Sequence, residues 1–146
     1  MKATSRSPEE TEEIGLRIGR KLKAGDTVLL YGDLGAGKTT MVKGIGSALG
    51  IDRKDITSAS FTIIAEYPGN PPFFHIDLYR TSGEMDLEST GIWDCIGSHS
   101  ISVVEWAEHA EGELPENSLK VTIKIAENDT REIIIEGRDE KDWDNL

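Results

Sequence analysis

The chain contains one cysteine among its 146 residues, Cys95, so it cannot form an internal disulfide. It also lacks an apolar run of about 20 residues, the length that spans a bilayer, and it has no signal-peptide pattern. These absences predict a cytoplasmic protein without membrane contacts. Cys95 itself lies in the apolar context of residues 92–96, which favours a buried structural thiol over a nucleophile, because reactive thiols need positive charge nearby.

Basic residues are scarce as well. The chain has 16 Lys and Arg against 27 Asp and Glu, which gives a formal net charge of −11. A nucleic-acid-binding face needs clustered basic side chains, so we expect no DNA binding and contact with RNA only through a partner. The length fits a single domain over residues 1–146, and the polar end at 139–146 is expected to fray, with Trp143 as its one possible anchor.

What the sequence does contain is a glycine-rich loop, GDLGAGKT at residues 32–39, of the pattern G-x-x-x-x-G-K-[ST]. A strand pattern at 27–31 precedes it and a helical pattern at 38–49 follows it. In this order the loop amides and the helix N-terminus form a phosphate site, with Lys38 reaching the β- and γ-phosphates and Thr39 ligating Mg²⁺. The alternative, a glycine-rich turn with a surface lysine, does not account for the flanking strand and helix. The predicted nucleotide-binding residues are Gly32, Asp33, Leu34, Gly35, Ala36, Gly37, Lys38, Thr39 and Thr40.

A loop that hydrolyses a nucleotide needs a carboxylate on a neighbouring strand. Two apolar runs end in an acid, one at Asp77 and the other at Glu105, and both acids are candidates to hold Mg²⁺ or to orient water. Considered alone, either acid could equally be a solvated residue at the end of a strand. The spacing does not show which of the two would hold Mg²⁺ and which would orient water. His75 lies on the same face of its strand as Asp77, as a ligand, a water-positioning group or a hydrogen-bonded core histidine.

The remaining pattern predicts an α/β fold, a single-domain P-loop NTPase-like fold with a mixed central sheet flanked by helices and a C-terminal β-hairpin. A first helix begins after the N-cap Ser7, presents Ile14, Ile18 and Leu22 on one face, and ends at Gly25-Asp26. The other expected elements are an antiparallel pair of strands at 61–67 and 73–79, a mostly helical stretch at 82–96, a strand at 101–104, a helical turn at 106–111, and a hairpin of 119–125 and 131–136.

Hydroxyl groups at Ser58, Ser60 and Thr62 precede the second strand. They are candidates to sense a γ-phosphate, as a switch segment does, or are ordinary polar strand positions.

Together these motifs resemble the bacterial ATPase family that supports threonylcarbamoyladenosine formation in tRNA, the TsaE type. The resemblance extends from Thr11 to Arg131. The motifs that carry it are GDLGAGKTT (32–40), SASFTIIAEY (58–67), HIDLYR (75–80), the Gly-Ile pair at 91–92 and VVEW (103–106). The family usually has Ser-Pro-Thr where this chain has Ser58-Ala59-Ser60, which removes a fixed φ angle but keeps the Ser60 hydroxyl.

The resemblance implies slow, Mg²⁺-dependent hydrolysis of ATP, so that ATP and Mg²⁺ are the expected cofactors. It makes Lys38, Asp77 and Glu105 the catalytic residues, with Thr39 and Glu105 at the metal. It also implies that Ser60 and Trp106 lie close to the nucleotide, and that Thr11 and Arg131 contact its base side.

The same resemblance implies two partners, the tRNA threonylcarbamoyl transferase subunit and that subunit's inactive paralogue. The modified base would be adenosine 37 of tRNAs that read codons beginning with A. An acidic protein is expected to dock on a basic partner rather than on the tRNA itself.

Two other functions fit a phosphate loop. A small-molecule kinase would need an acceptor pocket and an arginine-bearing lid, whereas this chain has seven scattered arginines and no long insertion. A non-hydrolysing, nucleotide-gated adaptor would not need the two acids. A GTPase would carry N-K-x-D, which does not occur in the sequence.

Overall fold

The computed structural model describes residues 1–57, 63–81, 90–97 and 99–137. These residues form a seven-stranded mixed sheet in the order β1-β7-β6-β2-β5-β4-β3. The elements are β1 (Lys2–Ser5), α1 (Pro8–Lys21), β2 (Thr27–Tyr31), α2 (Lys38–Ala48), η1 (Arg53–Asp55), β3 (Ile64–Tyr67), β4 (Phe73–Asp77), η2 (Tyr79–Thr81), α3 (Ile92–Cys95), β5 (Ile101–Glu105), η4 (Ala107–Ala110), β6 (Leu119–Ile125), η5 (Glu127–Asp129) and β7 (Arg131–Glu136).

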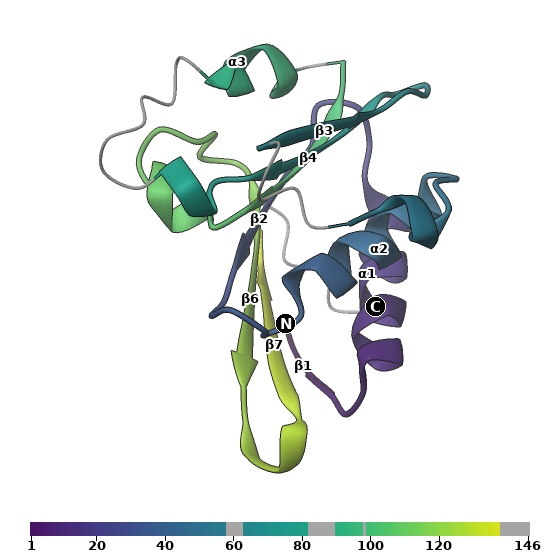
Figure 1. Ribbon diagram of the computed structural model, residues 1–146, viewed down its shortest axis with the longest axis vertical. Helices are drawn as coiled ribbons and strands as arrows, with labels where there is room; N and C mark the ends of the chain where they lie inside the picture. Colours follow the sequence, from purple (N-terminus) through teal and green to yellow (C-terminus); the bar gives the residue numbers. More distant parts are fainter. Residues whose placement is uncertain (58–62, 82–89, 98, 138–146) are drawn as a thin grey trace.

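The centre of the sheet is parallel and its margins are antiparallel. Strand β2 runs parallel to both β5 and β6, and β4 runs parallel to β5. The pairs β3–β4, β6–β7 and β1–β7 are antiparallel. The carboxyl ends of β2, β4 and β5 therefore meet at one edge, which is where open α/β sheets bind their ligands. The predicted α/β class, the mixed sheet and the C-terminal hairpin, which projects from the body in Figure 1, are all confirmed.

Helices α1 and α2 pack together on one face of the sheet, while α3 lies on the other side (Figure 1). The alternating side chains of β2 divide the core accordingly: Val28 and Leu30 join the cluster under α1 and α2, and Leu29 joins the cluster with α3 and η4. Cys95 lies in this second cluster, and burial raises the pKa of its thiol. The predicted burial of Cys95 is thus confirmed.

The start of α1 follows the predicted capping pattern. The Ser7 hydroxyl accepts a hydrogen bond from the Glu10 amide at 3.1 Å, and Pro8 occupies the first turn. The predicted apolar face of the first helix is confirmed, because Ile18 and Leu22 are buried in the core and Ile14 packs against it. Gly15 and Gly19 supply the contact with α2. This contact is close, because a Cβ added at Gly15 would lie 2.4 Å from the Met41 carbonyl oxygen.

Several predicted boundaries need correction. The first helix ends at Lys21, before Gly25, since Leu22 turns to extended backbone. The strand predicted over 73–79 ends at Asp77 because η2 begins at Tyr79. Strand β5 extends one residue further, to Glu105, and β1 was not predicted.

Two other predictions are only partly covered. Strand β3 is described from Ile64, and the start of the predicted strand over 61–67 lies outside the described residues. Of the predicted helical stretch at 82–96, residues 82–89 also lie outside them, and α3 covers Ile92–Cys95. The tail at 139–146 lies outside them as well.

Candidate functional site

The glycine-rich loop connects β2 to α2, as the sequence predicts. Gly37 is the N-cap of α2 and adopts a left-handed conformation with φ of 111°, which residues with a Cβ rarely adopt. Gly32 lies against the backbone of β6, where an added Cβ would be 2.7 Å from the Ile123 carbonyl oxygen. These two glycines let the chain reverse within one short loop and aim the first turn of α2 at the carboxyl edge of the sheet.

Lys38 is the first residue of α2, and its side chain folds back onto the loop, where the residue is 6% exposed. Its ammonium donates to the Gly32 carbonyl and, at 3.4 Å, to the Asp33 carbonyl, and it lies 3.8 Å from the centroid of the Trp106 ring. Trp106 follows β5 with a left-handed φ of 57°, an uncommon conformation for a large side chain. Burial lowers the pKa of Lys38, while Glu105 is the strongest of the acids that oppose this effect.

The hydroxyl of Thr39 meets the carboxylate of Glu105. Its Oγ1 lies 3.3 Å from each carboxylate oxygen, although the two residues are 66 positions apart in the sequence. Glu105 is the last residue of β5, where it is 3% exposed and stands in register with Asp77 of β4. The parallel pairing of β4 with β5 thus brings both predicted acids to the same edge, beside the first turn of α2.

The two acids have different surroundings. Glu105 Oε2 lies 2.5 Å from His75 Nε2, and both side chains are buried. Asp77 is 3% exposed, and its Oδ1 accepts a hydrogen bond from the Tyr79 amide at 2.9 Å. Burial raises the pKa of Asp77, and the neighbouring Glu105 raises it further.

The donor set can be compared with the needs of Mg²⁺. Thr39 and Glu105 present oxygen atoms, the hard ligands that Mg²⁺ prefers, with the Asp77 carboxylate on the adjacent strand. Within the described residues, no cluster of three or more His, Cys, Asp or Glu side chains could hold a metal alone. Mg²⁺ usually takes one or two carboxylates and completes its shell with phosphate and water oxygens, so this set fits Mg²⁺ bound with a nucleotide.

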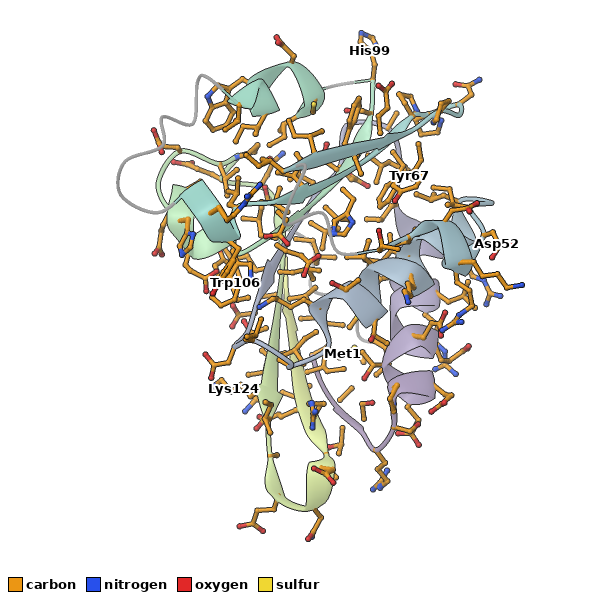
Figure 2. The ribbon with its side chains drawn as sticks, viewed as in Figure 1. Met1, Asp52, Tyr67, His99, Trp106 and Lys124 are labelled. Atoms are coloured by element: carbon orange, nitrogen blue, oxygen red, sulfur yellow. The ribbon has the colours of Figure 1, made fainter. Side chains whose placement is uncertain are left out.

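Two adjoining cavities flank the loop. The first, of about 360 Å³, contains Lys38, Thr39 and both acids, and Trp106 and Tyr79 also line it. Trp106 is labelled in Figure 2, and its ring lies 4.9 Å from that of Tyr79, centroid to centroid. The second cavity, of about 300 Å³, lies between the loop and the start of α1. Gly35, Gly37 and Thr40 line both cavities, so a ligand seated on the loop can occupy both.

The second cavity contains the two residues predicted for the base side, Thr11 and Arg131. Arg131 reaches the loop directly, because its Nε donates to the Ala36 carbonyl at 3.0 Å. Thr11 is 2% exposed, and its hydroxyl shares a hydrogen bond of 2.7 Å with Ser5. Four other residues line the second cavity and were not predicted as site residues from the sequence: Arg6, Ser7, Pro8 and Asp129. The Ser7-Pro8 capping pattern was the only sequence signal near them.

Most predicted site residues therefore come together at one edge of the sheet. Leu34 is 75% exposed, although it lines the first cavity. Ser58, Ala59, Ser60 and Thr62 lie outside the described residues.

Comparison with known proteins shows the family of the chain and supports its fold. The sequence profile of the family described as threonylcarbamoyl adenosine biosynthesis protein TsaE matches residues 5–133. The chain belongs to the TsaE family. The TsaE family proteins of Treponema pallidum and Bacillus subtilis, both named tRNA threonylcarbamoyladenosine biosynthesis protein TsaE, are 37% and 43% identical to it. The first alignment covers 92% of this chain and 99% of the relative, and the second covers 87% and 79%.

A solved structure supports the fold of this TsaE family member. The crystal structure of YdiB from Bacillus subtilis superposes with a TM-score of 0.75 at 37% identity, covering 98% of this chain and 89% of that one. The resemblance inferred from the sequence motifs is therefore confirmed, and the names of the relatives connect the family with threonylcarbamoyladenosine biosynthesis in tRNA. In the described part of the chain, the helices are all too short or too polar to cross a membrane.

Proposed function

We propose that this TsaE family member is a Mg²⁺-dependent ATPase that supports the threonylcarbamoylation of adenosine 37 in tRNAs reading codons that begin with A. The observation that carries the proposal is the meeting of Lys38, Thr39, Asp77 and Glu105 in one cavity on a phosphate loop. A loop built only to hold a nucleotide would not need two buried carboxylates beside it.

Each residue has a role in this proposal. The loop amides and Lys38 neutralise charge on the transferring phosphoryl group. Thr39 and Glu105 would hold Mg²⁺, which would supply positive charge to offset the negative charge that develops on the phosphoryl group. Asp77 orients the attacking water and is suited to accept its proton, because burial raises its pKa and so makes its carboxylate a stronger base than that of an ordinary aspartate.

The second cavity would take the nucleoside. Thr11 and Arg131 line it, and the bond from Arg131 to the Ala36 carbonyl fixes the cavity wall relative to the phosphate loop. The absence of N-K-x-D from the sequence favours adenine over guanine. On the other side of the loop, Trp106 and Tyr79 border the end of the phosphate site.

The proposed partners are the tRNA threonylcarbamoyl transferase subunit and its inactive paralogue, with tRNA reached only through them. The cavity that holds both acids is bordered by the exposed Leu34 and Tyr79, which are available to a docked protein. An arginine supplied in trans accelerates such reactions by about 10³–10⁵-fold, so slow hydrolysis by the isolated chain is expected if a partner contributes one. The proposed location is the cytoplasm.

The proposal is tested by measuring phosphate release from ATP and Mg²⁺ with the chain alone, and again with the two partners. We expect slow release to water by the chain alone, acceleration by the partners, and loss of release in Lys38→Ala. Equal and fast rates with and without partners would contradict partner dependence. Transfer of the phosphate to an added acceptor would favour the kinase alternative, and ATP left unchanged after long incubation with the partners would favour the adaptor.

A further inference from the structure

We propose that His75 is a positioning residue that fixes the Glu105 carboxylate for the metal of the nucleotide site. The inference rests on the proposed function and gives His75 a role other than the three that the sequence left open, because the imidazole acts on the Glu105 carboxylate and not on the metal or on water. His75 Nε2 lies 2.5 Å from Glu105 Oε2, and the imidazole is fully buried. An ionised carboxylate can only accept hydrogen bonds, so Nε2 carries the hydrogen and donates it to Glu105.

The other ring nitrogen argues against a merely structural histidine. His75 Nδ1 is buried without a hydrogen-bond partner among the residues that the structure describes. An unpaired polar atom in a protein core costs free energy, which an apolar side chain of similar size would avoid. The imidazole is therefore best explained by what Nε2 does for Glu105.

The position of Glu105 shows what this bond achieves. Its carboxylate lies between Thr39 Oγ1 of α2, at 3.3 Å, and His75 of β4. A carboxylate held from two sides cannot rotate freely, so its lone pairs keep one orientation relative to the Thr39 hydroxyl. Partners that hold a metal ligand in this way matter, since their loss typically costs about 10–100-fold in metal affinity or activity.

Two amide substitutions test the proposal because they differ by one methylene group. The amide nitrogen of His75→Gln can reach the place of Nε2 and keep the bond to Glu105, whereas that of His75→Asn ends near Nδ1 and cannot. The readout is binding of an ATP analogue with an N-methylanthraniloyl fluorophore to the full 146-residue chain, in EDTA and across a Mg²⁺ titration. His99→Asn is the control, because His99 is exposed beyond the opposite end of β5 (Figure 2).

We expect His75→Asn to raise the half-saturating Mg²⁺ concentration by about 10–100-fold, while His75→Gln and His99→Asn stay near the wild-type value. In EDTA all four proteins should bind the analogue equally, because the phosphate loop is intact. His75→Leu, which loses the donor without burying an amide, should repeat the shift even if His75→Asn does not fold.

Equal Mg²⁺ midpoints in the Leu, Asn and Gln variants would overturn the positioning role of His75 and leave the proposed function standing. A wild-type chain that fails to bind the analogue at any Mg²⁺ concentration would overturn the proposed function, and the inference with it.

Discussion

Asp77 is a residue whose placement in the fold works against its own ionisation. It lies almost fully buried beside a second carboxylate, and both features raise its pKa. Its Oδ1 accepts a hydrogen bond from the Tyr79 amide, which stabilises the charged form in part. The folded chain therefore binds the Asp77 proton more tightly than the unfolded chain does, and it becomes less stable as pH rises through the range in which Asp77 ionises.

Substitution of Asp77 by Asn should consequently move stability and activity in opposite directions. Asn cannot ionise, but its side-chain oxygen can still accept from the Tyr79 amide, so Asp77→Asn should melt at a higher temperature than wild type near pH 7. The difference should vanish below the pKa of an unfolded aspartate, about 3.9. ATP turnover should fall by about 10²–10⁴-fold, the usual contribution of a general base.

Calorimetric melting curves over a range of pH, together with phosphate-release rates, check this expectation. The exposed Asp94, on α3, provides the matched control, because Asp94→Asn should change neither quantity appreciably. A variant at Asp77 that is less stable than wild type at neutral pH would contradict the argument from burial.

At this scale the sequence predicted which side chains gather beside the phosphate loop better than it predicted what they touch. The loop pattern identified Lys38 and Thr39, and the apolar runs identified Asp77 and Glu105, because each signal is local. The contact of Thr39 with Glu105 depends on the parallel pairing of strands, and the bond from His75 to Glu105 depends on their register. Neither contact can be predicted from a local sequence pattern.

At the scale of the elements, glycine residues form the close contact between α1 and α2. A Cβ added at Gly44 would lie 2.0 Å from the Glu12 carbonyl oxygen, and one at Gly15 would lie 2.4 Å from the Met41 carbonyl oxygen. Both obstacles are backbone atoms in helices, which cannot move aside as a flexible side chain can. This close approach sets the start of α1 beside the phosphate loop and so defines one wall of the second cavity.

Gly44→Ala should therefore lower the free energy of unfolding by about 1–3 kcal/mol, because the cost of overpacking outweighs the higher helix propensity of alanine. Urea unfolding monitored by circular dichroism measures the change. Gly97→Ala is the control, since no atom of the described residues lies within 4 Å of an added Cβ at that position. A Gly44→Ala variant as stable as the wild type would contradict this prediction, because it would show that α1 and α2 can move apart without loss of unfolding free energy.

Sequence patterns located most elements but missed those without a periodic signal. The first helix was recognised from its cap and its apolar face, whereas its glycine contact with α2 was not predicted, because glycine carries no apolar signal. Strand β1 is only four residues long and lies at the sheet edge, so it carries no clear alternation. Strand β4 was predicted too long, since η2 begins within the same H-x-D-L-Y-R motif.

For the molecule as a whole, the dominant property is its net charge of −11. If it works by docking on a basic surface of the transferase complex, long-range attraction should speed the encounter. The association rate constant should then fall by about tenfold or more as salt rises well above physiological ionic strength, with a much smaller change in the dissociation rate. Surface plasmon resonance at several salt concentrations measures both rates, and an association rate independent of salt would contradict steering.

The overall class of the fold was predictable because a strand, a phosphate loop and a helix occur in fixed order, and alternating runs surround them. The order of the strands was not, since it follows from which apolar faces cover one another across the whole chain. The composition excluded a basic nucleic-acid face, but it left the two cavities and their shared wall to the tertiary structure.

The register of β4 against β5 has an evolutionary consequence. His75 and Asp77 share one face of β4, and Asp77 stands opposite Glu105. Side chains alternate between the two faces along a strand. Deleting one residue inside β4 would therefore turn the Asp77 side chain to the other face and separate it from Glu105. We therefore expect insertions and deletions among related proteins to occur in turns, such as the turn between β3 and β4. Within β4 and β5 they would disrupt the site. The positions of the two acids therefore depend on the register between β4 and β5.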